Sequence, residues 1–469
     1  MPLPTIPSGN VASALGGGFK VANSCRFDRG SNPHMTKTQS DGDRDKWTYS
    51  CWFKLGSTFG AIRYLLTAKT DGSNYVTIEM DSANRIRFGN LVAGSYNGFK
   101  KTNEYWRDVG AWMHIVCVYD SENANAAHRM RVYINGTEIT SWATDTATTL
   151  NQDSAMNYSS ADVRVGNLDG ESSWWDGYMA EVCLVDGSAL APTSFGEFDT
   201  DGSPTIWKPI DVSGLTFGTN GFYLDFEDSS NLGNDANGGT DLTETNLDAT
   251  DSATDTPTNN FCTLNPLFKS GAFTSSTGAV VLSQGNCHLA EATHAVVCGT
   301  MGVTRGKWYW EVKMNGNDYP FGVLGTEPAG NASHSYNDST AYGIYIESSG
   351  GNTITAGNWS GSAIYTGNAT YMIAIDVDNN KLWCGKDGSW TGDPAAGSGN
   401  SVTLGTHEYA PWFHSAGTAG DNSASVNFGG CAAFTVSSSN SDGNGYGNFE
   451  YAVPSGFFSL CTKNLAEYG

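Results

Sequence analysis

Aromatic residues beside carboxylates and amides are the side chains of this sequence best suited to chemistry. An aromatic face can stack on a sugar ring while neighbouring polar groups donate and accept hydrogen bonds. Such residues occur in or beside stretches rich in Gly, Ser, Asn and Asp, where loops are expected. The candidate ligand-binding residues chosen on this ground are Asp169, Glu171, Trp174, Tyr336, Trp359 and Trp390. Packing in a core is the alternative role of each aromatic side chain, and the more frequent one.

A hydrolytic site has less support in the sequence. No Gly-x-Ser-x-Gly elbow, phosphate-binding loop or His-Glu-x-x-His motif is present. The two carboxylates of a retaining glycoside hydrolase lie about 5 Å apart, a spacing that alternate residues of one strand can provide. The nearest string is Tyr223-Leu-Asp225-Phe-Glu227, in which Tyr223 stands where the first carboxylate would be needed. We therefore expect no enzymatic activity, and polysaccharide degradation stays the less favoured alternative.

An acidic stretch between Lys208 and Lys269 is the place where a metal ion has to be considered. It contains ten acidic residues and no basic one. Carboxylate and amide oxygens suit calcium, but the spacing does not fit the EF-hand loop. The weak candidate metal ligands are Asp225, Glu227, Asp228 and Asp235. A solvated loop is the simpler interpretation, so we expect no cofactor and leave calcium open as the alternative.

The composition of the chain limits the fold classes and the binding partners that can be expected. The chain has 469 residues, of which 57 are Gly and only 16% are charged, which favours two or more domains built of short strands and frequent turns. Its net charge of −23 would repel nucleic-acid phosphates and anionic lipid, so neither is an expected partner. No window approaches the roughly 20 apolar residues of a membrane span, and no secretory signal is visible at Met1.

The ten cysteines fit buried thiols better than disulfides. Cys51 and Cys117 alternate with apolar residues inside strand-like stretches, and no Cys-x-x-Cys pair suggests zinc. We therefore expect assembly in a reducing cytosol.

Alternating patterns predict strands along most of the chain. From Trp47 to Leu55 every second residue is aromatic or apolar, and Asn135-Gly136 predicts a tight hairpin turn. Several segments in this half resemble, in order, a laminin-G domain of the concanavalin-A type: Cys25–Asp28, Thr48–Lys54, Trp112–Tyr119, Val132–Thr137 and Asp176–Val182. The resemblance implies a jelly roll of two antiparallel sheets with ligand loops at its edges.

The last 200 or so residues resemble a different sandwich. In Gly306–Val312, alternation places Trp308, Trp310 and Val312 on one face of a strand, which indicates a sandwich core. That segment and six later ones resemble the landmarks of a SPRY domain: Phe321–Val323, Tyr342–Tyr345, Asp376–Trp383, Lys386–Trp390, Pro411–Phe413 and Val426–Gly429. The resemblance implies a second concanavalin-A-like sandwich that serves as a binding module.

The predicted fold class is therefore all-β, with two concanavalin-A-like jelly-roll sandwiches in tandem, the second SPRY-like. Its expected parts are an extended arm (1–17), a laminin-G-like sandwich (18–200), an acidic join with some strand structure (201–265) and the SPRY-like sandwich (266–469). Within the join, Phe222–Phe226 alternates as a strand does.

The arm and three further segments resemble virion structural proteins of tailed bacteriophages: Phe27–Ser31 followed by Trp47–Lys54, Thr256–Pro266 and Pro454–Leu465. The resemblance implies a fibre, spike or capsid-decoration protein made in the host bacterial cytoplasm and located on the virion. Its expected partners are a host-surface glycan or envelope, other virion proteins and further copies of itself, with a trimer as one arrangement. The alternative is a purely structural appendage or cement protein that contacts other virion subunits.

Overall fold

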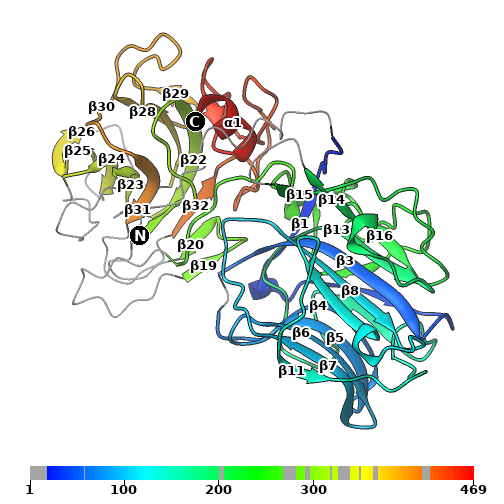
Figure 1. The fold of residues 1–469 in the computed structure, drawn as a ribbon. Helices are drawn as coiled ribbons and strands as arrows, with labels where there is room; N and C mark the ends of the chain where they lie inside the picture. The colour runs from blue at the N-terminus through cyan, green and yellow to red at the C-terminus, as the bar shows by residue number, and fades with distance from the viewer. Residues whose placement is uncertain are drawn as a thin grey trace. The chain divides into compact units, whose positions relative to one another are not determined.

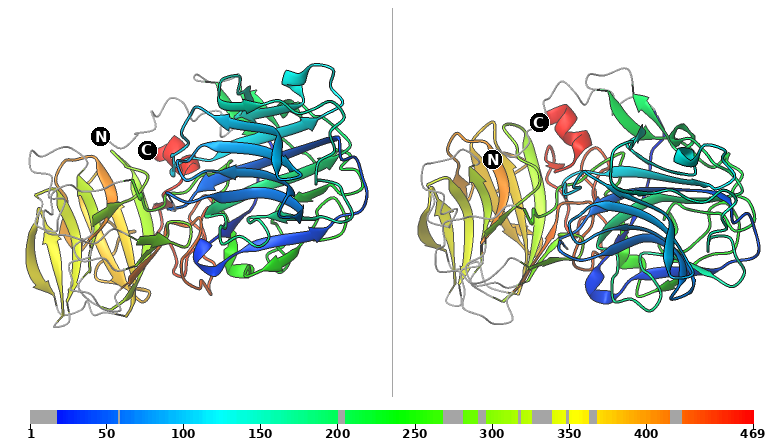
Figure 2. Two further views of the ribbon diagram at one scale, coloured as in Figure 1. Left: turned by 90° about the horizontal axis from the view of Figure 1, so that it is seen from below. Right: turned by 60° about the horizontal axis from the view of Figure 1, so that its bottom comes forward.

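A computed structural model describes residues 18–57, 59–199, 205–267, 281–290, 296–316, 319–325, 339–347, 350–362, 368–414 and 423–469. The predicted arm, residues 1–17, lies outside these ranges. Residues 17–258 form one compact unit, called here the first unit, and residues 259–469 belong to the second unit. Figures 1 and 2 show each unit as layered strands.

Two eight-stranded sheets form the sandwich of the first unit within the described residues. Sheet A contains, in spatial order, β10 Thr137–Glu138, β9 Met130–Ile134, β8 Met113–Asp120, β3 Lys46–Leu55, β13 Gly177–Asp186, β1 Ser24–Phe27 and β18 Ser252–Ala253, with β16 Phe222–Leu224 also beside β13. Sheet B contains β11 Trp142–Thr146, β7 Ser95–Thr102, β6 Ile86–Val92, β5 Asn74–Met80, β4 Arg63–Asp71, β12 Asp162–Val165, β2 His34–Thr38 and β17 Thr243–Thr245.

The alternation in β3 builds the core of this sandwich. Trp47, Cys51 and Phe53 are fully buried and pack with residues of sheet B in one apolar cluster. Trp47 stacks on Tyr119 of β8 and meets Phe88 of β6 edge-on, each with a centroid separation of 5.5 Å. The two sheets therefore face each other across large side chains, as the pattern predicts.

The hairpin predicted at Asn135-Gly136 is present between β9 and β10. Both residues have positive φ, 47° and 75°, as a type I′ turn requires. A second hairpin, β14 Gly196–Asp199 with β15 Ile206–Pro209, carries Trp207, whose ring lies against Gly136.

The second unit is also a sandwich of two sheets. Within the described residues, sheet C contains β19 Val281–Ser283, β20 His288–Ala290, β32 Ser423–Asn427, β22 Lys307–Asn315, β27 Thr370–Asp376, β28 Lys381–Lys386 and β29 Ser389–Trp390, with β30 Val402–Thr403 beside β28 and β33 Phe458–Ser459 beside β22. Sheet D contains β21 Val296–Cys298, β31 Tyr409–His414, β23 Tyr319–Gly325, β24 Ala341–Glu347, β25 Gly350–Thr355 and β26 Asn358–Ser362.

Strand β22 explains why that sandwich has two apolar layers around sheet C. Trp308, Trp310 and Val312 are buried in the cluster between the sheets, as predicted. On the opposite face Tyr309 packs in a separate apolar cluster, and Glu311 accepts hydrogen bonds from the Tyr309 hydroxyl and from the amides of residues 450 and 451. The chain after β32 therefore covers the outer face of sheet C. With these two sandwiches, the predicted all-β fold class is confirmed.

Helices are few in the described residues. They are η2 Arg29–Ser31, η3 Ala126–His128, η4 Pro192–Ser194, η5 Ala249–Asp251 and α1 Thr462–Tyr468. Among the described residues no helix has the length and apolar character needed to cross a membrane. All ten cysteines are described, all are buried and no disulfide joins them, so the expected thiol state is confirmed.

The acidic stretch agrees with its prediction in one respect, because the strand expected in Phe222–Phe226 is present as β16, but its carboxylates differ from the prediction. Its described part up to Thr258 belongs to the first unit, where β16, β17 and β18 extend sheets A and B. Its carboxylates include three that form ion pairs with cations from earlier strands: Lys37–Asp235 (3.6 Å), Arg26–Asp251 (3.2 Å) and Lys54–Asp255 (2.7 Å). The interpretation as a solvated loop is therefore wrong for these three carboxylates. The cations that pair with them lie about 200 residues earlier in the sequence, so the charges within the stretch alone do not reveal them.

Candidate functional site

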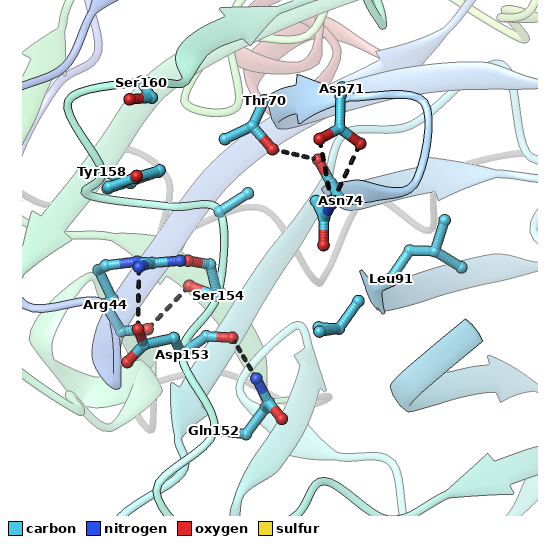
Figure 3. A pocket seen from close by; sticks show the side chains of 12 residues that line it. Arg44, Thr70, Asp71, Asn74, Leu91, Gln152, Asp153, Ser154, Tyr158 and Ser160 are labelled. Carbon is cyan, nitrogen blue, oxygen red and sulfur yellow. Dashed lines mark hydrogen bonds and ion pairs between the residues drawn. The ribbon is translucent and has the colours of Figure 1, made fainter. Parts of the chain in front are cut away.

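A polar hollow at the edge of the first sandwich is the best candidate site. It has a volume of about 610 Å³ and lies between the turn joining β4 to β5, the end of β6 and the loop that precedes β12 (Figure 3). Its polar lining consists of Arg44, Thr70, Asp71, Asn74, Gln152, Asp153, Ser154, Tyr158 and Ser160, and its apolar lining of Leu91, Val92 and Ala155.

One wall of the hollow is organised around Arg44. The guanidinium lies 4.1 Å from the centre of the Tyr158 ring and forms an ion pair of 2.8 Å with Asp153. Its Nε donates to the Ser154 carbonyl at 2.9 Å, and the Ser154 hydroxyl donates back to the Arg44 carbonyl at 2.8 Å. These contacts hold the loop against the start of β3, so this wall is a preformed surface with charged, hydroxyl and aromatic groups.

The opposite wall is the turn between β4 and β5 (Figure 3). Both carboxylate oxygens of Asp71 accept hydrogen bonds from Asn74 Nδ2 at 3.1 Å, and one also accepts from the Ser73 amide at 2.7 Å. The Asn74 side-chain oxygen in turn accepts from the Ala93 amide at 2.9 Å. The Ser73 amide is the main cause that lowers the pKa of Asp71, so this carboxylate is ionised at neutral pH.

This arrangement suits recognition of a hydroxyl-rich ligand. Carboxylate, amide and hydroxyl groups line both walls, with Leu91 and Val92 supplying a small apolar patch. Groups of this kind, placed on a rigid scaffold, fix the orientation of a polar ligand.

Acid–base catalysis has little support in the hollow. A glycoside hydrolase needs one carboxyl group with a raised pKa as its general acid. The pKa of Asp71 is lowered, and Asp153 is held in an ion pair. Burial raises the pKa of Glu181 to about 8, but this residue lies on β13, hydrogen-bonded at 2.7 Å to the Tyr223 hydroxyl, and does not line the hollow.

A Ser–His pair in sheet A also lacks the polarity of a catalytic dyad. The Trp207 indole N–H donates to His114 Nδ1 at 3.0 Å, so Nε2 carries the ring proton and donates to the Ser50 hydroxyl at 2.8 Å. Burial lowers the pKa of His114 to about 3, which keeps the ring neutral. Because Nε2 already carries a proton, it cannot take one from Ser50, and the network is structural.

The predicted residues of the first unit lie in one loop outside the hollow. Asp169 is exposed and paired with Arg164 at 2.8 Å, and Glu171 is also exposed. Trp174 is half-buried and forms a backbone bridge with Asn167. The loop brings these three residues together, while none of them is among the residues that line the hollow.

The predicted residues of the second unit are not gathered into a described site. Trp390 is half-buried, with its ring centre 6.3 Å from that of Tyr309, and it packs on the apolar cluster outside sheet C. Trp359 pairs with Ile354 in sheet D, but its side chain lies outside the described part, as does the whole of Tyr336.

The weak metal candidates take part in separate local interactions. Asp225 accepts from the Glu227 amide and Asp228 from the Ser230 amide, while Asp235 pairs with Lys37. Within the described ranges, no group of three or more His, Cys, Asp or Glu side chains could hold a metal ion.

The residues that line the hollow are not among the six ligand-binding candidates predicted from the sequence. Two signals were available. One is the turn Asp71-Gly-Ser-Asn74 between two strands, and the other is the polar loop from Asn151 to Ala161, in which Tyr158 is the aromatic residue.

One protein-family model matches most of the sandwich in the first unit. Residues 29–193 match the Laminin_G_3 family model, described as the concanavalin A-like lectin/glucanases superfamily. The laminin-G-like resemblance is thereby confirmed for this segment, which contains all the residues that line the hollow. A search of the curated proteins finds no match.

Three similar solved structures share 10–16% sequence identity with this chain. A heptameric SAP-like pentraxin from Limulus polyphemus is 16% identical, with 44% of this chain and 96% of that chain covered and a TM-score of 0.29. The PSpry domain of TRIM65 is 10% identical, with 36% and 92% covered and a TM-score of 0.28. The SPRY domain of human HERC1 is 14% identical, with 32% and 89% covered and a TM-score of 0.24. TM-scores of this size do not establish a relationship.

Proposed function

We propose that the protein is a non-enzymatic virion component of a tailed bacteriophage that binds a saccharide of the host surface. The observation that carries the binding role is the polar hollow on the laminin-G-like unit, whose two walls present carboxylate, amide and hydroxyl groups beside Tyr158. The virion setting is supported by the resemblance of the segments Thr256–Pro266 and Pro454–Leu465.

Weak individual sites are sufficient for such a role. A shallow sugar site with a millimolar Kd contributes only about −4 kcal/mol. Display of several copies on one particle would increase avidity by roughly 10²–10⁴. The proposal therefore includes a homo-oligomer, with a trimer as one arrangement, and synthesis in the host cytoplasm is consistent with the ten buried thiols.

The test is binding of the purified full chain to a glycan array and to host envelope. In Ser160→Tyr, a bulky side chain at an exposed position of the lining should fill the hollow and reduce binding about tenfold or more. Ser213→Tyr, at an exposed position of the same unit outside the lining, is the matched control and should bind as the unmodified protein does. An equal loss of glycan binding in Ser160→Tyr and Ser213→Tyr, or no binding of the unmodified protein to any glycan, would contradict the proposal.

A structural role is the second candidate, favoured by one surface feature. Phe198 and Ile206 of the β14–β15 hairpin are 45% and 43% exposed, so each face of the hairpin offers a large apolar side chain for a protein–protein contact. If the chain cements virion subunits, it should associate with other virion proteins while binding no glycan. Phe198→Ser should weaken that association, whereas Ser160→Tyr should leave it intact.

A further inference from the structure

The charged residues that line the hollow are one cation, Arg44, and two carboxylates, Asp71 and Asp153, so negative charge is in excess. Arg44 is the cation of the lining, and its positive charge is neutralised by the Asp153 carboxylate, 2.8 Å away. Its Nε donates to the Ser154 carbonyl, and the Tyr158 ring lies against the guanidinium plane. An anionic ligand would therefore compete with the Asp153 carboxylate for this arginine.

Asp71 leaves a net negative charge on the opposite wall. Its hydrogen bonds come from the Ser73 amide and the neutral Asn74 side chain, and the ion pairs among the described residues include none with Asp71. Neutral donors orient a carboxylate without removing its charge. The nearby Lys69 ammonium is the weakest of the causes that lower the pKa of Asp71, and it donates a hydrogen bond to the Asp169 carbonyl. Asp71 thus presents to the hollow, at neutral pH, a charged carboxylate whose direct hydrogen bonds come from neutral groups.

We infer that the hollow selects uncharged saccharides and rejects acidic ones, such as uronates and sialates. This inference rests on the proposed function and specifies its ligand class. A sugar hydroxyl can donate to Asp71 and accept from neighbouring amides and hydroxyls, whereas a sugar carboxylate would meet a like charge. The net charge of −23 on the whole chain acts in the same direction at longer range.

The experiment compares sugars that differ at one carbon, where a neutral hydroxymethyl group is replaced by a carboxylate. The glycan array should contain neutral polysaccharides together with uronate- and sialate-bearing ones. For each neutral hit, the methyl glycoside and its C6 uronate are then titrated against the full chain at low and at high salt. We expect the uronate to bind about tenfold more weakly or worse at low salt, with the difference reduced at high salt because mobile ions screen exposed charges.

Asp153→Asn provides a gain-of-binding test. Loss of that carboxylate frees the Arg44 guanidinium, so uronate affinity relative to the neutral sugar should rise about tenfold. The matched control is Asp228→Asn, which removes an exposed carboxylate from a similar turn, where it accepts from the Ser230 amide at 2.9 Å, outside the hollow. Its ratio of uronate to neutral affinity should not change.

The outcomes separate this inference from the proposed function. Hits confined to acidic glycans, equal affinity for a uronate and its neutral partner, or a ratio unaffected by Asp153→Asn would overturn the inference and leave saccharide binding intact. An array with no hits, together with no binding to host envelope, would overturn the proposed function and the inference with it.

Discussion

The ion pair between Lys54 and Asp255 should be one of the strongest constraints in the first unit. Lys54 lies on β3 and Asp255 follows β18, so the pair joins parts of the chain 201 residues apart. Its Nζ–Oδ2 distance is 2.7 Å, and both side chains are 1% exposed. The second carboxylate oxygen accepts the Trp112 indole N–H at 2.9 Å.

Asp255→Asn removes the charge with little change in shape. The buried Lys54 ammonium then loses the carboxylate charge of Asp255, a loss that typically costs about 3–5 kcal/mol. For a unit of this size each kcal/mol lowers Tm by roughly 2–4 °C, so a loss of about 6–20 °C is expected. The buried pair matters because both members are desolvated; an exposed pair contributes about 0–1 kcal/mol.

The assay is thermal unfolding followed by hydrogen exchange, which reads peptides of residues 17–258 separately from those of 259–469. Asp228→Asn, an exposed charge removal, is the control. Lys54→Met and the double variant complete a cycle, and the double variant should be less destabilised than the sum of the single variants. A free energy of unfolding for Asp255→Asn within about 0.5 kcal/mol of that of the control would show that the pair does not constrain the fold.

Three further predictions concern buried groups. Burial raises the pKa of Glu181 to about 8, above the value near 4.3 that a glutamate has in the unfolded chain. The stability contributed by the bound proton is complete below about pH 4.3 and is lost as the pH rises through 8, so the free energy of unfolding should fall over that range. Urea titrations from pH 5 to pH 8 should show the fall, and Glu181→Gln should flatten it. Glu311→Gln should destabilise the second unit by about 1–3 kcal/mol in calorimetry, because an amide cannot accept all the hydrogen bonds made to this carboxylate. Gly136→Ala should lower stability by about 1–3 kcal/mol in the same assay, since φ is 75° and a Cβ would lie 2.4 Å from the Trp207 ring. An unchanged free energy of unfolding in Glu311→Gln or in Gly136→Ala would contradict the role given to that residue's contacts.

Strand structure was predictable because its signals are local. The alternation at Trp308, Trp310 and Val312, and the turn at Asn135-Gly136, each depend on fewer than ten adjacent residues and appear as predicted. The acidic stretch was misread because its partners are distant: no local pattern relates Asp255 to Lys54.

The sequence marks two loops of the hollow separately, but it does not show that they meet. The walls of the hollow come from residues near positions 44, 71, 91 and 155, which only the sheet order of the first unit brings together. Aromatic residues beside polar groups predicted Trp174 and Trp390, yet the aromatic residue of the hollow is Tyr158, whose ring lies against Arg44. Side-chain type indicates what a residue could do, whereas topology decides which residues act together.

The central claim, that the hollow binds a saccharide, is tested most directly by a crystal structure of the full chain soaked with the strongest neutral sugar from the array. We predict electron density for one sugar ring between Asp71 and the Arg44–Asp153 pair, with ring hydroxyls within hydrogen-bond distance of both walls. Density at the Asp169–Trp174 loop or in the second unit, with the hollow holding solvent alone, would contradict the account.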